Sequence, residues 1–305
     1  MKQKVALALG SGGARGLAHI GVIEELEKQG FEISSISGCS MGAVIGGFYG
    51  MGKLNAYSDW ICSLNKRDVY SLMDITLSQS GLLKGDRVFN KMKELIPDML
   101  IENMRIPFSA VATDVISRKE VVFTSGSFYT AARASTAIPA IITPYSTGDK
   151  IYVDGGVLNP VPVNHVKRAD GDILVAVNLY DDKQNTAEHE DENRKVLSGE
   201  KKVSEHRWIN VNSSIEYLQQ KIQELIPKSD NQNQGYLTLL QLTSSMMLTR
   251  ISNLLMEINK PDIVINIPAN SAKTFEFHKA SKLIKTGREV TNHQIREFLL
   301  QEKNR

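Results

Sequence analysis

Residues 5–16 read VALALGSGGARG, and this stretch decides what fold to expect. Its first five residues are all apolar and the run stops at Gly10, which is typical of a short strand buried in a parallel sheet. The glycine-rich segment 10–16 cannot continue as a regular strand or helix, so we expect a turn there. From residue 17 to residue 28 apolar side chains recur at helical spacing, and Gly30 ends the run. A strand, a glycine loop and a helix therefore follow one another within about 30 residues.

A second unit of the same kind follows directly. Residues 31–37 are short and contain Ile33 and Ile36, and they lead into the pentapeptide GCSMG at 38–42. The small and apolar residues at 43–49 then predict a helix. The chain thus repeats the order of strand, turn and helix.

Later segments continue this alternation. Short apolar runs predict further strands at residues 108–113, 150–154, 173–178 and 262–267. Helical spacing predicts helices at residues 87–95, 128–135, 213–226, 236–258 and 275–287. Alternating strands and helices indicate an α/β fold, in which an open and mostly parallel central sheet carries helices on both faces.

Composition excludes several classes of protein. The chain has 305 residues, of which 42% are hydrophobic, and its 36 basic and 34 acidic residues leave a net charge of +2. So small a charge gives no electrostatic reason to expect a nucleic-acid partner. Two cysteines, Cys39 and Cys62, are too few for a disulfide scaffold. The apolar run at 5–9 is too short for a signal peptide, and no run of about 20 apolar residues occurs, so we expect a cytoplasmic protein.

We expect the 305 residues to form a single domain. Blocks at 5–180 would carry the chemistry, and the almost wholly polar segment 181–202 would be a surface loop. Residues 203–305 would form a C-terminal helical region with the last strand. The helix expected at 236–258 is apolar around much of its circumference, which favours a buried core helix over a homodimer or membrane-facing surface.

The GCSMG pentapeptide has the spacing of a nucleophilic serine. A serine on a sharp turn between a strand and a helix requires very small residues two positions before and after it, and Gly38 and Gly42 flank Ser40 in this way. The helix N-terminus beneath the hydroxyl favours developing negative charge. Cys39 is a competing nucleophile by its chemistry, but the glycines bracket Ser40, so we expect Cys39 to be a packing residue.

The glycine loop has two interpretations. A dinucleotide site needs a third glycine where Arg15 stands and an acidic residue at the end of the second strand, which instead ends in Ser37 and Gly38. The alternative is an oxyanion hole made by the amides of Gly12, Gly13 and Ala14. Arg15 would then hold the loop by bonding to carbonyl groups, with a substrate phosphate as the second interpretation.

A serine nucleophile needs a base. None of the six histidines lies in a motif that ends a hydrolase triad; they are His19, His165, His189, His206, His278 and His293. The other candidate is Asp154, which ends a strand and precedes Gly155 and Gly156, although an isolated Asp-Gly-Gly is more often a capped turn. Burial beside the serine would have to make this carboxylate more basic than usual.

Four blocks of the sequence resemble the patatin-like phospholipase family, and its bacterial branch in particular. They are LGSGGARGLAHIGV at 9–22, GCSMGA at 38–43, ASTAIP at 134–139 and DGGVLNPVP at 154–162. Residues 261–288 also resemble the C-terminal part of bacterial members. The likeness therefore covers most of the chain, and it identifies 1–305 as a single patatin-like hydrolase domain.

The resemblance implies a three-layer α/β/α sandwich and a lipid acyl hydrolase that needs no metal and no cofactor. By position, Ser40 would be the nucleophile and Asp154 its base in a dyad without histidine, with Gly12, Gly13 and Ala14 as the oxyanion loop. Residues 134–139 would line or support the site. This chain has Ser11 where the family loop usually carries a further glycine.

The expected partner is a lipid or acyl-ester substrate. Its acyl group would be released as a fatty acid by way of an acyl-enzyme. With so little net charge, any peripheral membrane contact would rest on apolar contact rather than on attraction to anionic head groups. The alternative function is a non-catalytic regulator that binds acyl chains or a protein on the same fold. The sequence leaves the head group and acyl length open.

Overall fold

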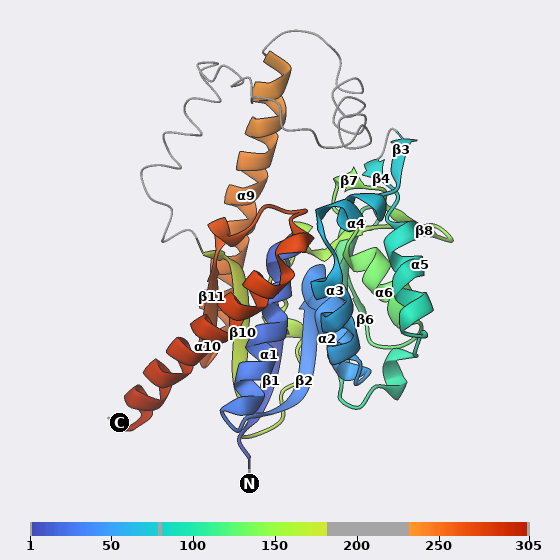
Figure 1. The fold of residues 1–305 in the computed structure, drawn as a ribbon. Coiled ribbons are helices and arrows are strands. Elements are labelled where there is room, and N and C mark those ends of the chain that lie inside the picture. The colour runs from blue at the N-terminus through green and yellow to red at the C-terminus, as the bar shows by residue number, and fades with distance from the viewer. Residues whose placement is uncertain (1, 79–80, 182–231, 304–305) are drawn as a thin grey trace. The chain divides into compact units, whose positions relative to one another are not determined.

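The computed structural model describes residues 2–78, 81–181 and 232–303 (Figure 1). The chain divides into two compact units, Met1–Asp181 with Leu248–Arg305, and Asp182–Met247. Of the second unit, the description covers only the first part of helix α9 (Gln232–Asn259). The helix expected at 213–226, and all but the first residue of the polar segment at 181–202, lie outside the described residues.

A mostly parallel sheet forms the centre of the first unit. Its strands follow the order β11-β10-β1-β2-β5-β9-β8, and β6 pairs with β5. The five from β11 to β5 are parallel, and β6, β8 and β9 are antiparallel to their neighbours. Their bounds are β1 Lys4–Leu9, β2 Glu32–Cys39, β5 Phe108–Asp114, β6 Lys119–Phe123, β8 Tyr145–Thr147, β9 Lys150–Asp154, β10 Ile173–Asp181 and β11 Ile263–Pro268.

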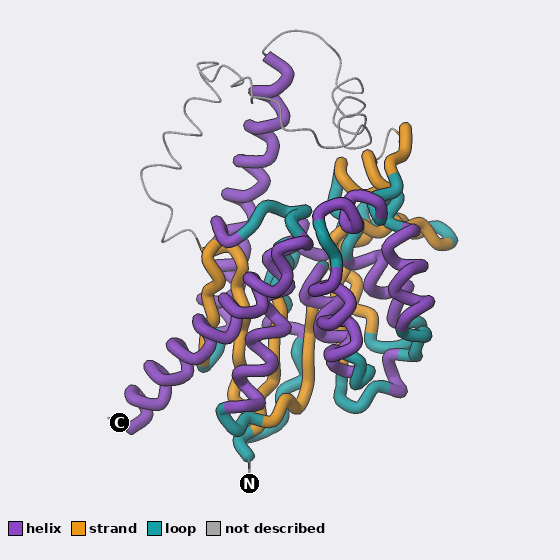
Figure 2. The backbone as a smooth tube through the Cα atoms, viewed as in Figure 1, coloured by secondary structure: helices purple, strands orange, loops and turns teal. Residues whose placement is uncertain are grey.

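Strand β1 lies in the middle of the sheet because both of its faces are apolar. Val5, Leu7 and Leu9 face a large core that includes helices α1, α2 and α10, and Ala6 and Ala8 face a smaller one with Val161 and Val163. Figure 2 shows the helices in purple against the orange strands. The helices are α1 Ala18–Lys28, α2 Met41–Gly50, α3 Leu54–Ser63, α4 Lys66–Ser71, α5 Asp86–Leu95, α6 Phe128–Ser135 and α10 Ala280–Lys303. This arrangement confirms the α/β class with a mostly parallel central sheet and flanking helices.

Residues 51–107 form an insertion between α2 and β5, of which the sequence pattern predicted only the helix at 87–95. It contains α3, α4 and α5, together with the strands β3 (Ile75–Ser78) and β4 (Gly81–Leu83). These two strands form a small second sheet with β7 (Ala140–Ile142), separate from the central one. The insertion supplies one wall of the site described below.

All six expected strands are present, and their ends fall within three residues of the expected positions. The helices expected at 17–28, 43–49, 87–95 and 128–135 correspond to α1, α2, α5 and α6. The helix expected at 275–287 was placed wrongly. Helix α10 begins at Ala280 because the Glu276 carboxylate accepts the Lys273 amide and holds a turn before it.

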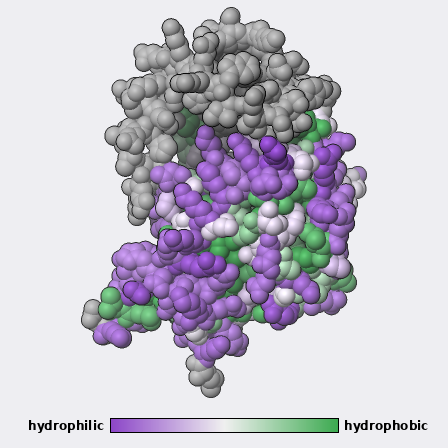
Figure 3. Space-filling model, in the orientation of Figure 1, coloured by the Kyte–Doolittle hydropathy of each residue, from purple (hydrophilic) through white to green (hydrophobic). Residues whose placement is uncertain are grey.

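The helix expected at 275–287 ends at Gly287, but in the structure Gly287 lies inside α10. The glycine is there because α10 contacts α1 at this position. A Cβ atom at Gly287 would lie 2.1 Å from the Ala18 carbonyl oxygen on α1. The two helices thus approach at backbone distance, and α10 continues past Gly287 to Lys303. Its buried side chains extend as far as Ile295, whereas Leu299 and Leu300 in its last turns are exposed. The outward surface on this side of the molecule is mostly hydrophilic (Figure 3).

Helix α9 departs from the expectation of a buried core helix. In its last turns, which belong to the first unit, Leu254 is 37% exposed and Ile258 is 73% exposed. The core interpretation is therefore wrong for this part of the helix, and a homodimer or membrane-facing surface stays a prediction. Within the described part of the chain, no helix combines the length and apolarity that crossing a bilayer requires.

The close approach at Gly287 predicts that Gly287→Ala destabilises the protein. In an ordinary helix this change stabilises by up to about 1 kcal/mol, because alanine is the better helix former. Overpacking against α1 should reverse the sign and lower the free energy of unfolding by about 1–3 kcal/mol. Chemical denaturation measures the change, with the exposed Lys282→Ala in the same helix as control. An unchanged or raised stability would contradict this packing.

Candidate active site

Ser40 lies at the sharp turn between β2 and α2, as its spacing predicts. Its backbone adopts φ 54° and ψ −121°, a left-handed conformation that is rare for a residue with a side chain. A Cβ atom at Gly42 would lie 2.1 Å from the Leu9 carbonyl oxygen, and one at Gly38 would lie 2.4 Å from the Gly42 carbonyl oxygen. Both flanking glycines are therefore required by close backbone contacts. Such local strain is characteristic of nucleophile turns.

Asp154 is brought beside this turn by strand register. On β5, Val111 pairs with Cys39 of β2, and the next residue, Ala112, pairs with Asp154 of β9. Strand β6 occupies the other edge of β5 at these residues. Strands β2 and β9 must therefore share one edge of β5 and meet end to end there. The carboxyl group of Asp154 consequently lies next to the end of β2, where Ser40 follows.

The Asp154 carboxyl group is almost completely buried, with the residue 5% exposed. Burial raises its pKa from 3.8 to about 6, because the charged form loses its hydration. Hydrogen bonds from the Ser40 hydroxyl, the Gly156 amide and the Cys39 thiol oppose this shift. The Gly156 amide lies 2.8 Å from Oδ1, at the start of the turn Gly155–Val157. The result is a carboxylate that is more basic than an exposed one and is held against the serine.

The structure places the competing groups in other roles. Burial raises the pKa of the Cys39 thiol well above its usual value, with the Asp154 charge adding to the effect, so Cys39 is not an activated nucleophile. His19 Nε2 lies 2.8 Å from the Gly10 carbonyl oxygen, and His165 Nε2 lies 2.6 Å from Glu120 Oε2. Neither imidazole pairs with Ser40. His189 and His206 lie outside the described residues.

The glycine loop is fixed at both ends, and one expected oxyanion donor has another partner. The Ser11 amide donates to the Pro160 carbonyl at 2.8 Å, and the Ala14 amide donates to the Thr274 carbonyl at 2.9 Å. Ala14 is therefore not a free donor, which corrects the expectation for this residue. The amides of Gly12 and Gly13 have no hydrogen bond among the described residues. The sequence could not reveal this, because Thr274 is distant in the chain.

Two side chains hold the loop from outside. Arg15 donates from Nε to the Gly12 carbonyl at 3.2 Å and from Nη1 to the Ala269 carbonyl at 2.9 Å. These are the carbonyl contacts expected for it. His19 bonds to the Gly10 carbonyl, and burial lowers its pKa to about 4, so it stays neutral near pH 7.

Ser135, from the block at 134–139, supports the nucleophile turn. Its hydroxyl accepts the Ser40 amide at 2.8 Å and donates to the Val111 carbonyl at 2.6 Å. The Asp154 amide donates to the Ala137 carbonyl at 2.9 Å. One short segment thus fixes the backbone of both Ser40 and Asp154.

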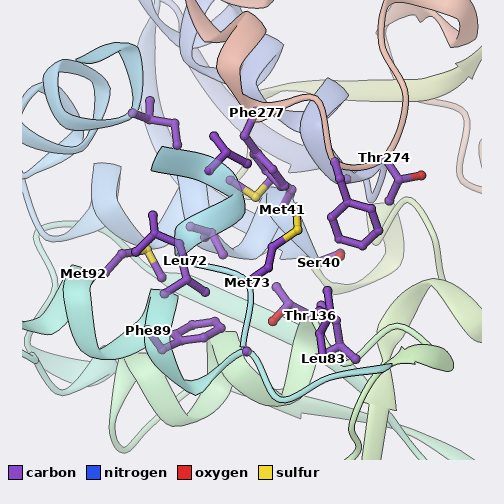
Figure 4. Close-up of a pocket in the computed structure, with 18 of the residues that line it drawn as sticks. Ser40, Met41, Leu72, Met73, Leu83, Phe89, Met92, Thr136, Thr274 and Phe277 are labelled. Atoms are coloured by element: carbon purple, nitrogen blue, oxygen red, sulfur yellow. The ribbon is translucent and has the colours of Figure 1, made fainter. Parts of the chain in front are cut away.

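An apolar pocket opens beside Ser40 (Figure 4). It contains about 960 Å³ of empty space, a volume that includes the open solvent at its mouth. Phe89 and Met92 of α5 lie across the pocket from Ser40, and Met41, Thr136 and Thr274 lie near it (Figure 4). Other lining residues come from the insertion and the C-terminal segment; they include Tyr57, Trp60, Ile61, Val69, Leu72, Leu83, Phe275 and Phe277. The sequence does not predict this wall, because the insertion carries no motif.

Arg133 of α6 hydrogen-bonds to backbone carbonyls of the pocket wall that faces this helix. Its Nη2 donates to the Lys84 carbonyl at 2.5 Å and to the Thr143 carbonyl at 3.1 Å. Asp74 accepts the amides of Gly85 and Arg87 at 2.6 Å and 3.1 Å. These contacts join α6, the end of β7 and the start of α5, so the pocket has a defined shape.

Comparisons with known proteins find matches to one family model and to individual relatives. A family model described as patatin-like phospholipase matches residues 7–167. An uncharacterized NTE family protein of Mycobacterium tuberculosis is 42% identical over 176 residues, covering 58% of this chain and 49% of that protein. A lysophospholipase of Yarrowia lipolytica is 27% identical over 185 residues, covering 58% of this chain and 13% of its own length.

The match therefore spans about half of the mycobacterial relative. Among solved structures, VipD from Legionella pneumophila matches with a TM-score of 0.43 at 14% identity, covering 97% of this chain and 67% of that one.

The buried carboxyl group predicts that Asp154→Asn is more stable than the parent above pH 6. The folded state holds the Asp154 proton more tightly than the unfolded state, so the parent loses stability as pH rises from about 4 to about 6. Asparagine cannot ionise, and the variant should gain at most about 3 kcal/mol by pH 8.

Urea denaturation between pH 4 and pH 8 measures this difference. Asp149→Asn makes the same chemical change on the exposed turn between β8 and β9 and is the matched control. A difference between Asp154→Asn and the parent that does not grow with pH would show that the carboxylate is not destabilised by burial.

Proposed function

Because the chain belongs to the patatin-like phospholipase family, we propose that it is a serine lipid acyl hydrolase that uses Ser40 as nucleophile and Asp154 as base. The observation that carries the proposal is the meeting of these two residues at one edge of β5, where Ser40 also lines an apolar pocket. The lysophospholipase name of a relative supports the same class of substrate.

Acylation begins with proton transfer. The Ser40 hydroxyl donates a hydrogen bond to Asp154, and the carboxylate accepts the proton as the oxygen attacks the ester carbonyl. A pKa of about 6 suits this task, because the carboxylate is mostly ionised near pH 7 yet more basic than an ordinary aspartate. The strained backbone at Ser40 holds the oxygen in one position relative to the ester.

Negative charge then develops on the carbonyl oxygen of the substrate. The free amides of Gly12 and Gly13, in a loop that is fixed at Ser11 and Ala14, stabilise this charge. One such donor typically contributes about 3–4 kcal/mol in the transition state. Asp154 returns its proton to the leaving alcohol, and an acyl-enzyme remains on Ser40. Water activated by Asp154 then releases the fatty acid.

The pocket accepts the acyl part of the ester. Its wall contains almost no polar side chains between Ser40 and Met92, so an alkyl chain gains burial there and a charged head group would not. The head group therefore leaves with the alcohol on the solvent side. The proposal covers phospholipids, lysophospholipids and simple acyl esters, which share this acyl group.

Loss of either dyad residue should abolish hydrolysis. Ser40→Ala removes the nucleophile and Asp154→Asn removes the base, so each should lower kcat on a p-nitrophenyl acyl ester by at least about a thousandfold. Steady-state kinetics with circular dichroism to check folding measures this.

His165→Ala and His19→Ala serve as comparisons for the dyad. If Asp154→Asn stayed active while one of them did not, a histidine triad would replace the dyad. Labelling by a fluorophosphonate probe should require Ser40. A folded parent that neither hydrolyses esters nor takes the label would favour a regulator that only binds acyl chains.

The far end of the pocket should set the acyl length. Met92→Trp fills space across from Ser40, so kcat/KM for the palmitoyl ester should fall about tenfold, equivalent to losing burial of about two methylene groups. The butyryl ester should change less than about twofold, since its chain ends before Met92. Leu95→Trp, exposed on the same helix, is the control. An equal loss on both esters would contradict the assignment of the pocket.

A further inference from the structure

A row of buried polar side chains leads from β10 to the Asp154 carboxyl group. It consists of Tyr180, Ser11 and Cys39, which come from three different segments and are each 7% exposed or less. None of them touches the pocket where the substrate would lie. Polar groups buried in this way need hydrogen-bond partners, because an unpaired buried polar group is costly.

The contacts along the row are continuous. The Tyr180 and Ser11 hydroxyl oxygens lie 2.7 Å apart, and Cys39 Sγ lies 3.7 Å from Asp154 Oδ1. Between these two pairs, hydrogen bonding from the Ser11 hydroxyl acts to lower the pKa of the Cys39 thiol. The space is closed as well, because a Cβ atom on Gly156 would lie 2.9 Å from Ser11 Oγ. The row therefore ends on the carboxyl oxygen that also accepts the Gly156 amide.

Counting protons fixes the direction of the row. Ionised Asp154 only accepts, so the Cys39 thiol donates its single proton to Oδ1. The Ser11 hydroxyl donates its proton to the sulfur, and the Tyr180 hydroxyl must then donate to Ser11. Every hydrogen bond thus points toward the carboxylate. Hydrogen bonds arranged in series polarise one another and strengthen the last one.

Burial first, and then the surrounding charges, raise the pKa of the Cys39 thiol and keep it protonated. Glu120 on β6 and Asp154 itself both disfavour a thiolate at Cys39. At the other end, the guanidinium carbon of Arg15 lies 5.3 Å from the Tyr180 ring centroid. Cys39 therefore stays a hydrogen-bond donor.

We propose that Cys39, held by Ser11 and Tyr180, is a positioning residue that keeps Asp154 ionised and oriented as the base. The proposal rests on the proposed function, in which Asp154 takes the Ser40 proton. It also explains why an unreactive thiol stands next to the nucleophile. Burial raises the pKa of Asp154, and the hydrogen bond from Cys39 lowers it. Without the Cys39 thiol, Asp154 should therefore bind its proton more tightly.

Four variants of the full chain test this proposal. Cys39→Ala removes the donor, Cys39→Ser keeps one, and Tyr180→Phe removes the outermost hydroxyl. Cys62→Ala removes the exposed cysteine on α3 and is the control. The measurements are the acidic limb of kcat/KM against pH on a p-nitrophenyl ester, and the carboxyl titration of Asp154 by ¹³C NMR, assigned with Asp154→Asn.

In the parent, the midpoint of the acidic limb of kcat/KM should lie near pH 6. Cys39→Ala should move it, and the NMR titration, upward by about half a pH unit to one unit, since a hydrogen bond to a charged group is at stake. Cys39→Ser should return both toward the parent values. Tyr180→Phe should give a smaller upward shift, and Cys62→Ala none.

Unchanged midpoints in Cys39→Ala would overturn the proposal, since a residue that only packs changes rates or stability without moving them. A shift in Cys39→Ala that Cys39→Ser does not reverse would also overturn it. If Cys39→Ala does not fold, the pH midpoints of Cys39→Ser and Tyr180→Phe decide whether the proposal holds. A parent that hydrolyses no ester would refute the proposed function alone, because the NMR titration still tests the row.

Discussion

The end-to-end meeting of β2 and β9 on one edge of β5 is the constraint on which the site depends. Because β6 occupies the opposite edge, the parallel strand β2 and the antiparallel strand β9 must both end between Val111 and Ala112. A shift of either register by one residue would turn the Cys39 or Asp154 side chain to the other face of the sheet. Backbone hydrogen bonding, rather than a contact between side chains, thus places the proposed base, Asp154, beside the proposed nucleophile, Ser40.

This placement buries the Asp154 carboxyl group, which costs stability and makes the group more basic. A carboxylate without water is costly, and the raised pKa of Asp154 expresses that cost. The same burial makes it basic enough to take a serine proton near neutral pH, so the instability and the proposed function have one cause. The Gly156 amide and the Cys39 thiol limit the effect, because each donates to Oδ1. A carboxyl group with no such donors would remain protonated to higher pH and would be a poorer base.

Sequence patterns predicted the parts of this site that follow from local rules. The alternation of strands and helices gave the fold class, and the glycines around Ser40 indicated the turn, because close backbone contacts admit no side chain there. Asp154 depended on resemblance, since its role follows from pairing between strands distant in the chain. Nothing local predicted the pocket, because α3, α4 and α5 carry apolar residues that would suit any core. Gly287 was misread because one glycine serves equally to end a helix or to admit a neighbouring one.

The glycine loop proposed as the oxyanion hole shows the same limit most clearly. Its sequence offers three consecutive amides, but the Thr274 carbonyl takes the third, so the C-terminal segment decides which donors are free. That segment also supplies Phe275 and Phe277 to the pocket. One stretch of chain therefore contacts both the loop that would hold the charged oxygen and the wall that would hold the acyl chain. Thr274, whose carbonyl accepts the Ala14 amide, is followed directly by Phe275 in the pocket wall, so the loop and the wall share one piece of backbone.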